Sequence, residues 1–218
     1  MTAPATPSPA DDDREPASLP VNPRASNWNI ANQLTVLRLV LVPVFGWLLL
    51  HDDGANDGWR IAAAVVFGIA AYTDRVDGNL ARSRNLVTSF GKLADPIADK
   101  ALIGMAFVGL SLLGELAWWV TIVVLVREIA VTLLRFWVIR HGVMPASRGG
   151  KLKTVLQGIA IALYVLPLTG VLASGRAVVM AVAVGVTVAT GVDYVVRAVV
   201  LRTTSDRAEM KRARKAAR

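Results

Sequence analysis

Six long apolar segments, separated by short polar links, make up most of the chain. They cover approximately residues 30–50, 59–79, 94–113, 117–139, 152–173 and 176–200. Each is close to the roughly 20 residues that a helix needs to cross the hydrocarbon core of a bilayer. A spanning segment must satisfy its own backbone hydrogen bonds, and the chain lacks the alternating strands of a membrane barrel. The pattern therefore predicts an all-α integral membrane protein with six transmembrane helices.

The composition argues against a water-soluble domain. Hydrophobic residues make up 54% of the 218 residues and charged residues only 18%, whereas a soluble domain carries about a quarter charged residues. The apolar content excludes a disordered chain, and the absence of cysteine excludes a disulfide scaffold. The net charge of +8 points to cytoplasmic loops and lipid headgroups, so we expect a lipid bilayer as partner and no nucleic acid.

The two ends of the chain differ from its apolar middle. Residues 1–27 are rich in Pro, Ala and Asp and lack the features of a signal peptide, which predicts a disordered N-terminal tail. Residues 202–218 hold seven basic and two acidic residues, which predicts a basic C-terminal tail suited to anionic headgroups. Residues 28–201 form the predicted six-helix membrane domain.

Basic residues gather in alternate links and at the C-terminal end. The first link is acidic, with Asp52, Asp53 and Asp57, and the third, around residues 114–115, has no basic residue. The basic residues of the second and fourth links are Arg75, Arg82, Arg84, Lys92, Arg140, Arg148, Lys151 and Lys153. Because Lys and Arg mark the cytoplasmic side, we expect a multi-pass protein of a bacterial plasma membrane with both termini inside.

Four aspartates lie where the second and third segments meet: Asp74, Asp77, Asp95 and Asp99. Spacings of three and four place each pair on one face of a helix. Carboxylates at a membrane boundary are costly unless a positive charge lies between them, and Mg²⁺ prefers carboxylates together with substrate phosphates. The cluster predicts a polar, metal-containing cavity at the cytoplasmic side. Asp95 precedes Pro96, which leaves the simpler alternative that Asp95 caps a helix.

The residues between these aspartates fit an anionic ligand. Arg82 is placed to meet an anion bound to the metal. Gly78, Ala81 and Gly91 would let a bulky ligand approach the backbone, although helix packing is the more common use of small residues in membranes.

The fourth segment carries charges within apolar sequence. Arg127 and Glu128 are consecutive and point about 100° apart, which predicts that they are poor partners for each other. Arg127 and Arg135 lie on nearly the same stripe and, with Lys151 and Lys153, would form a pocket for a dianionic phosphate. The alternative is that Arg135 reaches the membrane surface and the lysines only set the topology.

The acidic pattern is Asp74-x2-Asp77-Gly78-x2-Ala81-Arg82-x8-Gly91-x3-Asp95-x3-Asp99. It resembles the signature of the CDP-alcohol phosphotransferases, at all eight fixed positions. The resemblance implies a six-helix, usually homodimeric membrane enzyme that transfers a phosphatidyl group from CDP-diacylglycerol to an alcohol and releases CMP.

The resemblance also implies roles for individual residues. Asp74, Asp77 and Asp95 would hold Mg²⁺ or Mn²⁺, as a two-metal site, and Asp99 would be the general base and also touch one metal. The residues implied for CDP-diacylglycerol binding are Gly78, Ala81, Arg82, Thr88 and Gly91.

The stretch REIAVTLLRFWVIRHGVMPASRGGKLKTVLQ resembles phosphatidylglycerophosphate synthases, a branch of the same family. The opening NIANQLTVLRLVLVPVF is similar to their first segment, with Asn32, Thr35 and Arg38 at the same places and Ala31 where Pro is frequent. This implies sn-glycerol 3-phosphate as the acceptor. A phosphatidylinositol phosphate synthase, or a relative with another acceptor, is the nearest alternative. A cation transporter would also use membrane aspartates, but the chain shows no duplicated halves.

Overall fold

The computed structural model describes residues 29–83, 88–138 and 148–204, and in these ranges the chain is helical. The α-helices are α1 (Ile30–Leu50), α2 (Asp57–Ser83), α3 (Ser89–Leu112), α4 (Trp118–Val138), α5 (Arg148–Val165) and α6 (Gly170–Thr204). A short 3₁₀ helix, η2 (His51–Gly54), joins α1 to α2. Each predicted apolar segment corresponds to one α-helix. The predicted N-terminal tail and all but residues 202–204 of the predicted C-terminal tail lie outside the described residues.

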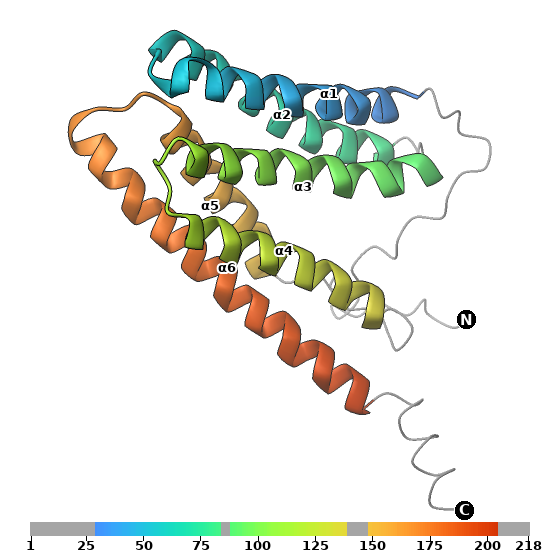
Figure 1. Cartoon of the computed structure of the whole chain (residues 1–218). Helices are drawn as coiled ribbons and strands as arrows, with labels where there is room; N and C mark the ends of the chain where they lie inside the picture. The colour runs from blue at the N-terminus through green and yellow to red at the C-terminus, as the bar shows by residue number, and fades with distance from the viewer. Residues whose placement is uncertain (1–28, 84–87, 139–147, 205–218) are drawn as a thin grey trace, which may run out of the picture.

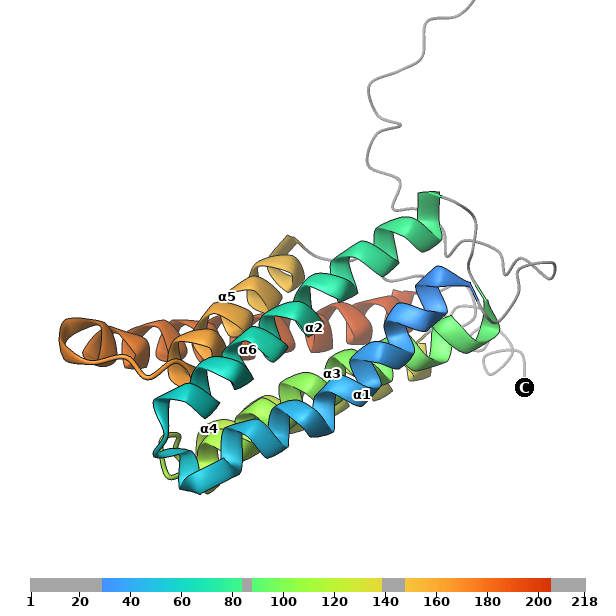
Figure 2. The same ribbon diagram turned by 90° about the horizontal axis from the view of Figure 1, so that it is seen from above.

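Successive helices run up and down, so one end of the bundle collects the starts of α1 and α3 and the ends of α2, α4 and α6 (Figures 1 and 2). Helix α1 packs against α2 and α3, while α6 packs against α4 and α5. Helix α5 also contacts α2 and α3 and so connects the two groups. The aspartate-rich parts of α2 and α3 therefore lie at the same end of the bundle as the basic end of α4.

The helices turn apolar side chains outward and keep several polar ones inside. Exposed apolar side chains occur on all six α-helices, for example Val40, Val65, Ile97, Ile122, Ile159 and Val182. The core is built around fully buried residues such as Phe45, Phe107 and Ile161, yet Arg38 is equally buried. Apolar surface of this extent marks contact with an apolar environment. This arrangement, with apolar side chains outside and several polar ones inside, supports a membrane-embedded, all-helical protein.

Two segments in the described part of the chain are long and apolar enough to cross a membrane by length and composition, Asn32–Gly54 and Gly170–Val200. Other helices carry charged residues within apolar sequence or have a shorter apolar part: α3 contains Asp95, Asp99 and Lys100, and the apolar part of α5 covers only Leu152–Val165. Charged groups lower the mean hydropathy of a segment even when they face the interior of a bundle. Six transmembrane helices remain a prediction.

The helix boundaries differ most from the predicted ones at the start of α3 and between α5 and α6. Asp95 is not an N-cap: α3 begins at Ser89, Thr88 is the cap whose hydroxyl accepts from the Gly91 N–H, and Pro96 lies inside the helix. The fifth helix ends at Val165 and does not extend to residue 173. The chain then passes through Pro167 and reaches Gly170, the first residue of α6. Gly170 has a φ of +64°, which lets the chain turn before α6 begins.

A partly buried ion-pair cluster connects the helices at the end of the bundle opposite the aspartates. Glu115, in the α3–α4 link, accepts hydrogen bonds from Arg60 of α2 and from Arg176 of α6, the latter at 2.8 Å. Arg60 also donates to the backbone carbonyls of Tyr164 and Val165 at the end of α5, and Arg176 lies 4.7 Å from the centroid of the Tyr164 ring. The cluster thus joins α2, α5, α6 and the link between α3 and α4.

Replacing Glu115 by Ala is expected to destabilise the protein by about 3 kcal/mol, because the buried Arg60 would lose its counter-charge. The measurement is the midpoint of thermal unfolding in detergent. Asp193→Ala is the control, since its pair with Arg197 on α6 is about half exposed and is expected to contribute less than about 1 kcal/mol. Equal midpoints for the two variants would contradict a stabilising role for the cluster.

Candidate active site at the aspartate end of the bundle

The first element of the site is an ion pair between α1 and α2. Arg38 is fully buried, and its Nη1 lies 2.6 Å from Oδ1 of Asp74, whose side chain is 41% exposed. A guanidinium inside an apolar bundle requires a counter-charge, and Asp74 supplies it near the end of α2. Part of the positive charge expected among the aspartates therefore comes from the chain itself.

A polar stripe on α1 fixes the start of α3. Asn32, Thr35 and Arg38 recur every three residues, so they share one face of the helix. The Asn32 Nδ2 donates to the Thr88 hydroxyl at 2.8 Å, and the Thr35 hydroxyl donates to Oδ1 of Asp95 at 2.5 Å. The stripe therefore positions both the N-cap of α3 and one of its aspartates.

Gly91 permits this close approach of α1. A Cβ at this position would lie 2.8 Å from Oδ1 of Asn32 and 3.8 Å from Oδ2 of Asp95. A side chain here would push Asn32 away from Thr88, to which it is hydrogen-bonded. The small residue predicted to admit a ligand thus has a packing role, and its contact with CDP-diacylglycerol stays a prediction, as does that of Thr88.

Asp74 and Asp99 line the same cavity. Its volume is about 420 Å³, and it lies among α1, α2, α3 and α5. Polar lining comes mainly from Arg38, Tyr72, Asp74, Arg75 and Asp99, while apolar residues such as Phe67, Leu102 and Ile159 complete the wall. We call this space the larger cavity, to distinguish it from a smaller cavity beside it that is described below. It brings carboxylates from two helices together beside apolar surface, and a few placed polar groups on an apolar wall are typical of a ligand-binding site.

The remaining predicted donor-side residues are only partly described. Asp95 faces Thr35 and is not among the residues that line the larger cavity. Asp77, Gly78, Ala81 and Arg82 lie in α2, but their side chains fall outside the described residues. Among the described residues, no three Asp, Glu, His or Cys side chains gather closely enough to hold a metal ion. Asp74 and Asp99 still supply two carboxylates in one cavity, the oxygen ligands that hard cations prefer.

Asp99 also lines a second, smaller cavity of about 20 Å³. The two cavities share Asp99, Ile103 and Thr154. Lys100, Glu128, Lys153 and Gln157 complete the polar lining of the smaller cavity. Asp99 experiences the charges of Asp74, Lys100, Lys153 and Arg38. It therefore stands between Asp74 and Arg38 on one side and Lys100 and Lys153 on the other.

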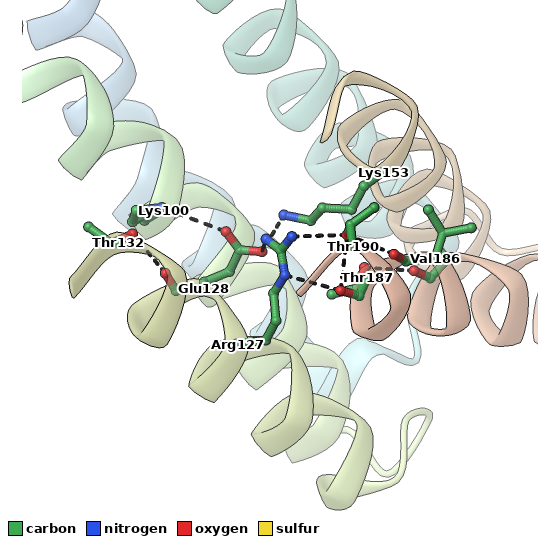
Figure 3. Close-up of polar contacts among 9 residues, drawn as sticks. Lys100, Arg127, Glu128, Thr132, Lys153, Val186, Thr187 and Thr190 are labelled. Atoms are coloured by element: carbon green, nitrogen blue, oxygen red, sulfur yellow. Dashed lines mark hydrogen bonds and ion pairs between the residues drawn. The ribbon is translucent and has the colours of Figure 1, made fainter. Parts of the chain in front are cut away.

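Three cations surround Glu128 (Figure 3), and we call this group the Glu128 cluster: Lys100, Arg127, Glu128 and Lys153. Lys153 donates a hydrogen bond to Oε1 of Glu128, and the Lys100 Nζ lies 3.6 Å from Oε2. With three positive charges and one negative charge, the cluster keeps an excess of positive charge inside the bundle, where an anion would be stabilised.

Arg127 is held by α6 and by its neighbour. Its Nε donates to the Thr187 carbonyl at 3.1 Å and its Nη2 to the Thr190 hydroxyl at 2.9 Å. The prediction that Arg127 and Glu128 are poor partners is wrong, because the Arg127 Nη1 lies 3.2 Å from Oε1 of Glu128. Long side chains bridge an angle that the helix geometry alone would keep open.

The predicted acceptor residues are thus only partly brought together. Lys153 and Arg127 both contact Glu128, whereas the side chains of Arg135 and Lys151 fall outside the described residues. Phosphate binding by these four residues stays a prediction. Lys100 was missed as a candidate, although its position directly after Asp99 was a usable signal.

Comparison with known proteins gives a consistent result. The family described as CDP-alcohol phosphatidyltransferase matches residues 28–189. A "probable phosphatidylglycerophosphate synthase" of Mycobacterium tuberculosis (strain H37Rv) is 56% identical over 175 residues, which cover 80% of this chain and 84% of the relative. A "CDP-diacylglycerol--glycerol-3-phosphate 3-phosphatidyltransferase" of Bacillus subtilis is 37% identical over 180 residues, covering 77% and 93%. One of the same name from Escherichia coli K12 is 38% identical over 141 residues, covering 62% and 75%.

Proposed function

The chain belongs to the CDP-alcohol phosphatidyltransferase family, and from this premise we propose that it transfers the phosphatidyl group of CDP-diacylglycerol to sn-glycerol 3-phosphate. The products are phosphatidylglycerol phosphate and CMP, so the enzyme serves phospholipid biosynthesis. The names of its relatives from three bacteria support this activity. The observation that carries the proposal is the position of Asp99 between the larger cavity and the smaller cavity, which Lys100 and Lys153 also line.

Asp99 is the proposed general base. In the reaction, a hydroxyl oxygen of glycerol 3-phosphate attacks the β-phosphorus of CDP-diacylglycerol. The bond from this phosphorus to the bridging oxygen breaks, and CMP leaves with the electron pair. The hydroxyl proton passes to the Asp99 carboxylate, which lines both cavities and is thus accessible from either side.

The donor binds, in this proposal, on the side of the larger cavity. Gly78, Ala81 and Gly91 would allow the nucleotide to approach the helices, Arg82 would contact the diphosphate, and Thr88 would contact the nucleotide. The apolar wall of the larger cavity, with Phe67 and Ile159, suits the adjoining lipid. Arg38 holds Asp74 in position for the reaction.

Asp74, Asp77, Asp95 and Asp99 would hold divalent metal, with two ions of Mg²⁺ or Mn²⁺ as the proposed occupancy. A bound divalent ion supplies charge neutralisation at the diphosphate and at the leaving CMP. The shared cavity of Asp74 and Asp99 supports this assignment. Asp95 would need to turn from Thr35 toward the same space, or to bind through its second oxygen.

A phosphorylated acceptor suits the smaller cavity better than a neutral alcohol. Lys100 and Lys153 both line it and both contact Glu128. Arg127 also contacts Glu128, so three cations stand against the two carboxylates at this place, and a dianionic phosphate is favoured there. Arg127, Arg135 and Lys151 are the further proposed contacts of this phosphate.

The proposed setting is a bacterial plasma membrane that the chain crosses several times, with both termini and the aspartate end in the cytoplasm. Basic links at this end support the orientation. The proposed assembly is a homodimer. Chemical cross-linking of the purified protein in detergent tests it: a single band at twice the monomer mass is expected, and monomer alone at every protein concentration would exclude the dimer.

Acceptor specificity tests the function. Purified protein is incubated with CDP-diacylglycerol, Mg²⁺ or Mn²⁺, and either labelled glycerol 3-phosphate or labelled inositol phosphate. We expect CMP release and labelled phosphatidylglycerol phosphate only with the first acceptor. Activity only with inositol phosphate would make the chain a phosphatidylinositol phosphate synthase and contradict the proposal.

A further inference from the structure

Gln157 of α5 is a buried polar side chain whose amide nitrogen has no hydrogen-bond partner among the described residues. Its residue is 2% exposed, and in the part of the chain that the structure describes its amide Nε2 makes no hydrogen bond. Several other buried polar side chains in the bundle are hydrogen-bonded: Thr121 to Ser111 and to the Phe107 carbonyl, and Asn32 to Thr88. Because an unmade hydrogen bond on a buried donor costs free energy, this amide is suited to a ligand.

The Gln157 side chain lies beside the residues that are proposed to bind the acceptor phosphate and to accept the hydroxyl proton. It follows Lys153 by one helical turn, and both residues line the smaller cavity together with Asp99 and Lys100. The two lysines already contact Glu128, whereas the Gln157 Nε2 is a neutral donor that makes no hydrogen bond within the described part of the chain. A neutral donor beside cations and a general base matches an oxygen of a hydroxylated phosphate ester.

We propose that Gln157 is a specificity-determining residue that donates a hydrogen bond to an oxygen of the acceptor alcohol and orients its reacting hydroxyl toward Asp99. This inference rests on the proposed function. The smaller cavity, about 20 Å³ in volume, has room for about one water molecule. The acceptor therefore lies across both cavities, past their shared residues Asp99, Ile103 and Thr154, and only part of it reaches Gln157.

The experiment compares wild type, Gln157→Leu and Gln157→Glu in steady-state assays with each substrate varied in turn. Both changes remove the donor, and Glu keeps the shape of the side chain. We expect KM for glycerol 3-phosphate to rise at least about tenfold, with KM for CDP-diacylglycerol within twofold of wild type. The midpoint of thermal unfolding should be unchanged or higher for Gln157→Leu, because the leucine leaves no buried donor unpaired.

Gln33→Leu is the matched control, since Gln33 is an exposed glutamine on α1 outside both cavities. It should leave both KM values unchanged. Unchanged KM for glycerol 3-phosphate in both Gln157 variants would overturn the inference and indicate a water as the partner of the amide. An equal rise of both KM values would also overturn it.

A second acceptor locates the bonded oxygen. 3-Hydroxypropyl phosphate lacks the middle hydroxyl of glycerol 3-phosphate but keeps its phosphate. If Gln157 bonds the hydroxyl, wild type should prefer glycerol 3-phosphate and Gln157→Leu should not; if it bonds the phosphate, the KM of both acceptors should rise equally in the variant. Either result supports the inference. Wild-type protein that is inactive with glycerol 3-phosphate would instead refute the proposed function, and the two failures are therefore distinguishable.

Discussion

Asp99→Asn is expected to reduce turnover by about 10²–10⁴-fold, the contribution of a general base. The substitution keeps the size of the side chain that lines both cavities, but an amide cannot accept the proton of the attacking hydroxyl. The measurement is kcat for CMP release at saturating CDP-diacylglycerol and glycerol 3-phosphate.

Nucleotide binding separates this effect from misfolding. At saturating Mg²⁺, which offsets the weaker metal binding expected of this variant, Asp99→Asn should bind CDP-diacylglycerol nearly as well as wild type, because the proposed donor contacts lie on other residues. Asp193→Asn, on the exposed face of α6, serves as the control for a lost carboxylate and should retain full turnover. Normal turnover in Asp99→Asn would show that another group accepts the proton.

Asp74→Asn is expected to impair both stability and turnover. The fully buried Arg38 guanidinium would lose the carboxylate that lies 2.6 Å away, which should cost about 3 kcal/mol of unfolding free energy. Turnover should fall by more than about 100-fold, because the carboxylate also contributes to the electrostatics at the diphosphate. Thermal unfolding and CMP release are measured on the same preparations.

A double variant separates the two roles of Asp74. In Asp74→Asn combined with Arg38→Met, the buried cation is removed together with its partner, so most of the lost stability should return. Turnover should stay low, since the carboxylate is still missing. Recovery of both properties in the double variant would mean that Asp74 acts only as the counter-charge of Arg38.

The positions of the helices were largely predictable from the apolar pattern, because each buried or lipid-facing stretch has the length of one helix. The differences at the start of α3 and between α5 and α6 have local causes. Thr88 caps α3 by accepting from Gly91, seven residues before Asp95, so Pro96 is accommodated inside the helix. Pro167 and Gly170 end one helix and begin another within a stretch whose hydrophobicity continues.

The site was less predictable, because its contacts join helices distant in the chain. The spacing of Asp74 and Asp99 identified them, and the structure places both on one cavity. The partners of Asp74 and Asp95 were not identified. Arg38 contacts Asp74, and Thr35 contacts Asp95, and both partners lie on α1, which precedes the two aspartates in the chain. The available signal was the recurrence of Asn32, Thr35 and Arg38 every three residues within an apolar segment. Gln157 gave none, since an isolated glutamine becomes informative only when its burial is known.

Metal binding tests most directly whether Asp74 and Asp99 form one reaction centre. Mn²⁺ is titrated into wild type, Asp74→Asn, Asp99→Asn and the control Asp193→Asn in detergent, and free Mn²⁺ is followed by electron paramagnetic resonance. We expect wild type and Asp193→Asn to bind Mn²⁺ equally, and Asp74→Asn and Asp99→Asn each to bind it at least about tenfold more weakly. Equal affinity in all the proteins would contradict a shared metal site of these two carboxylates.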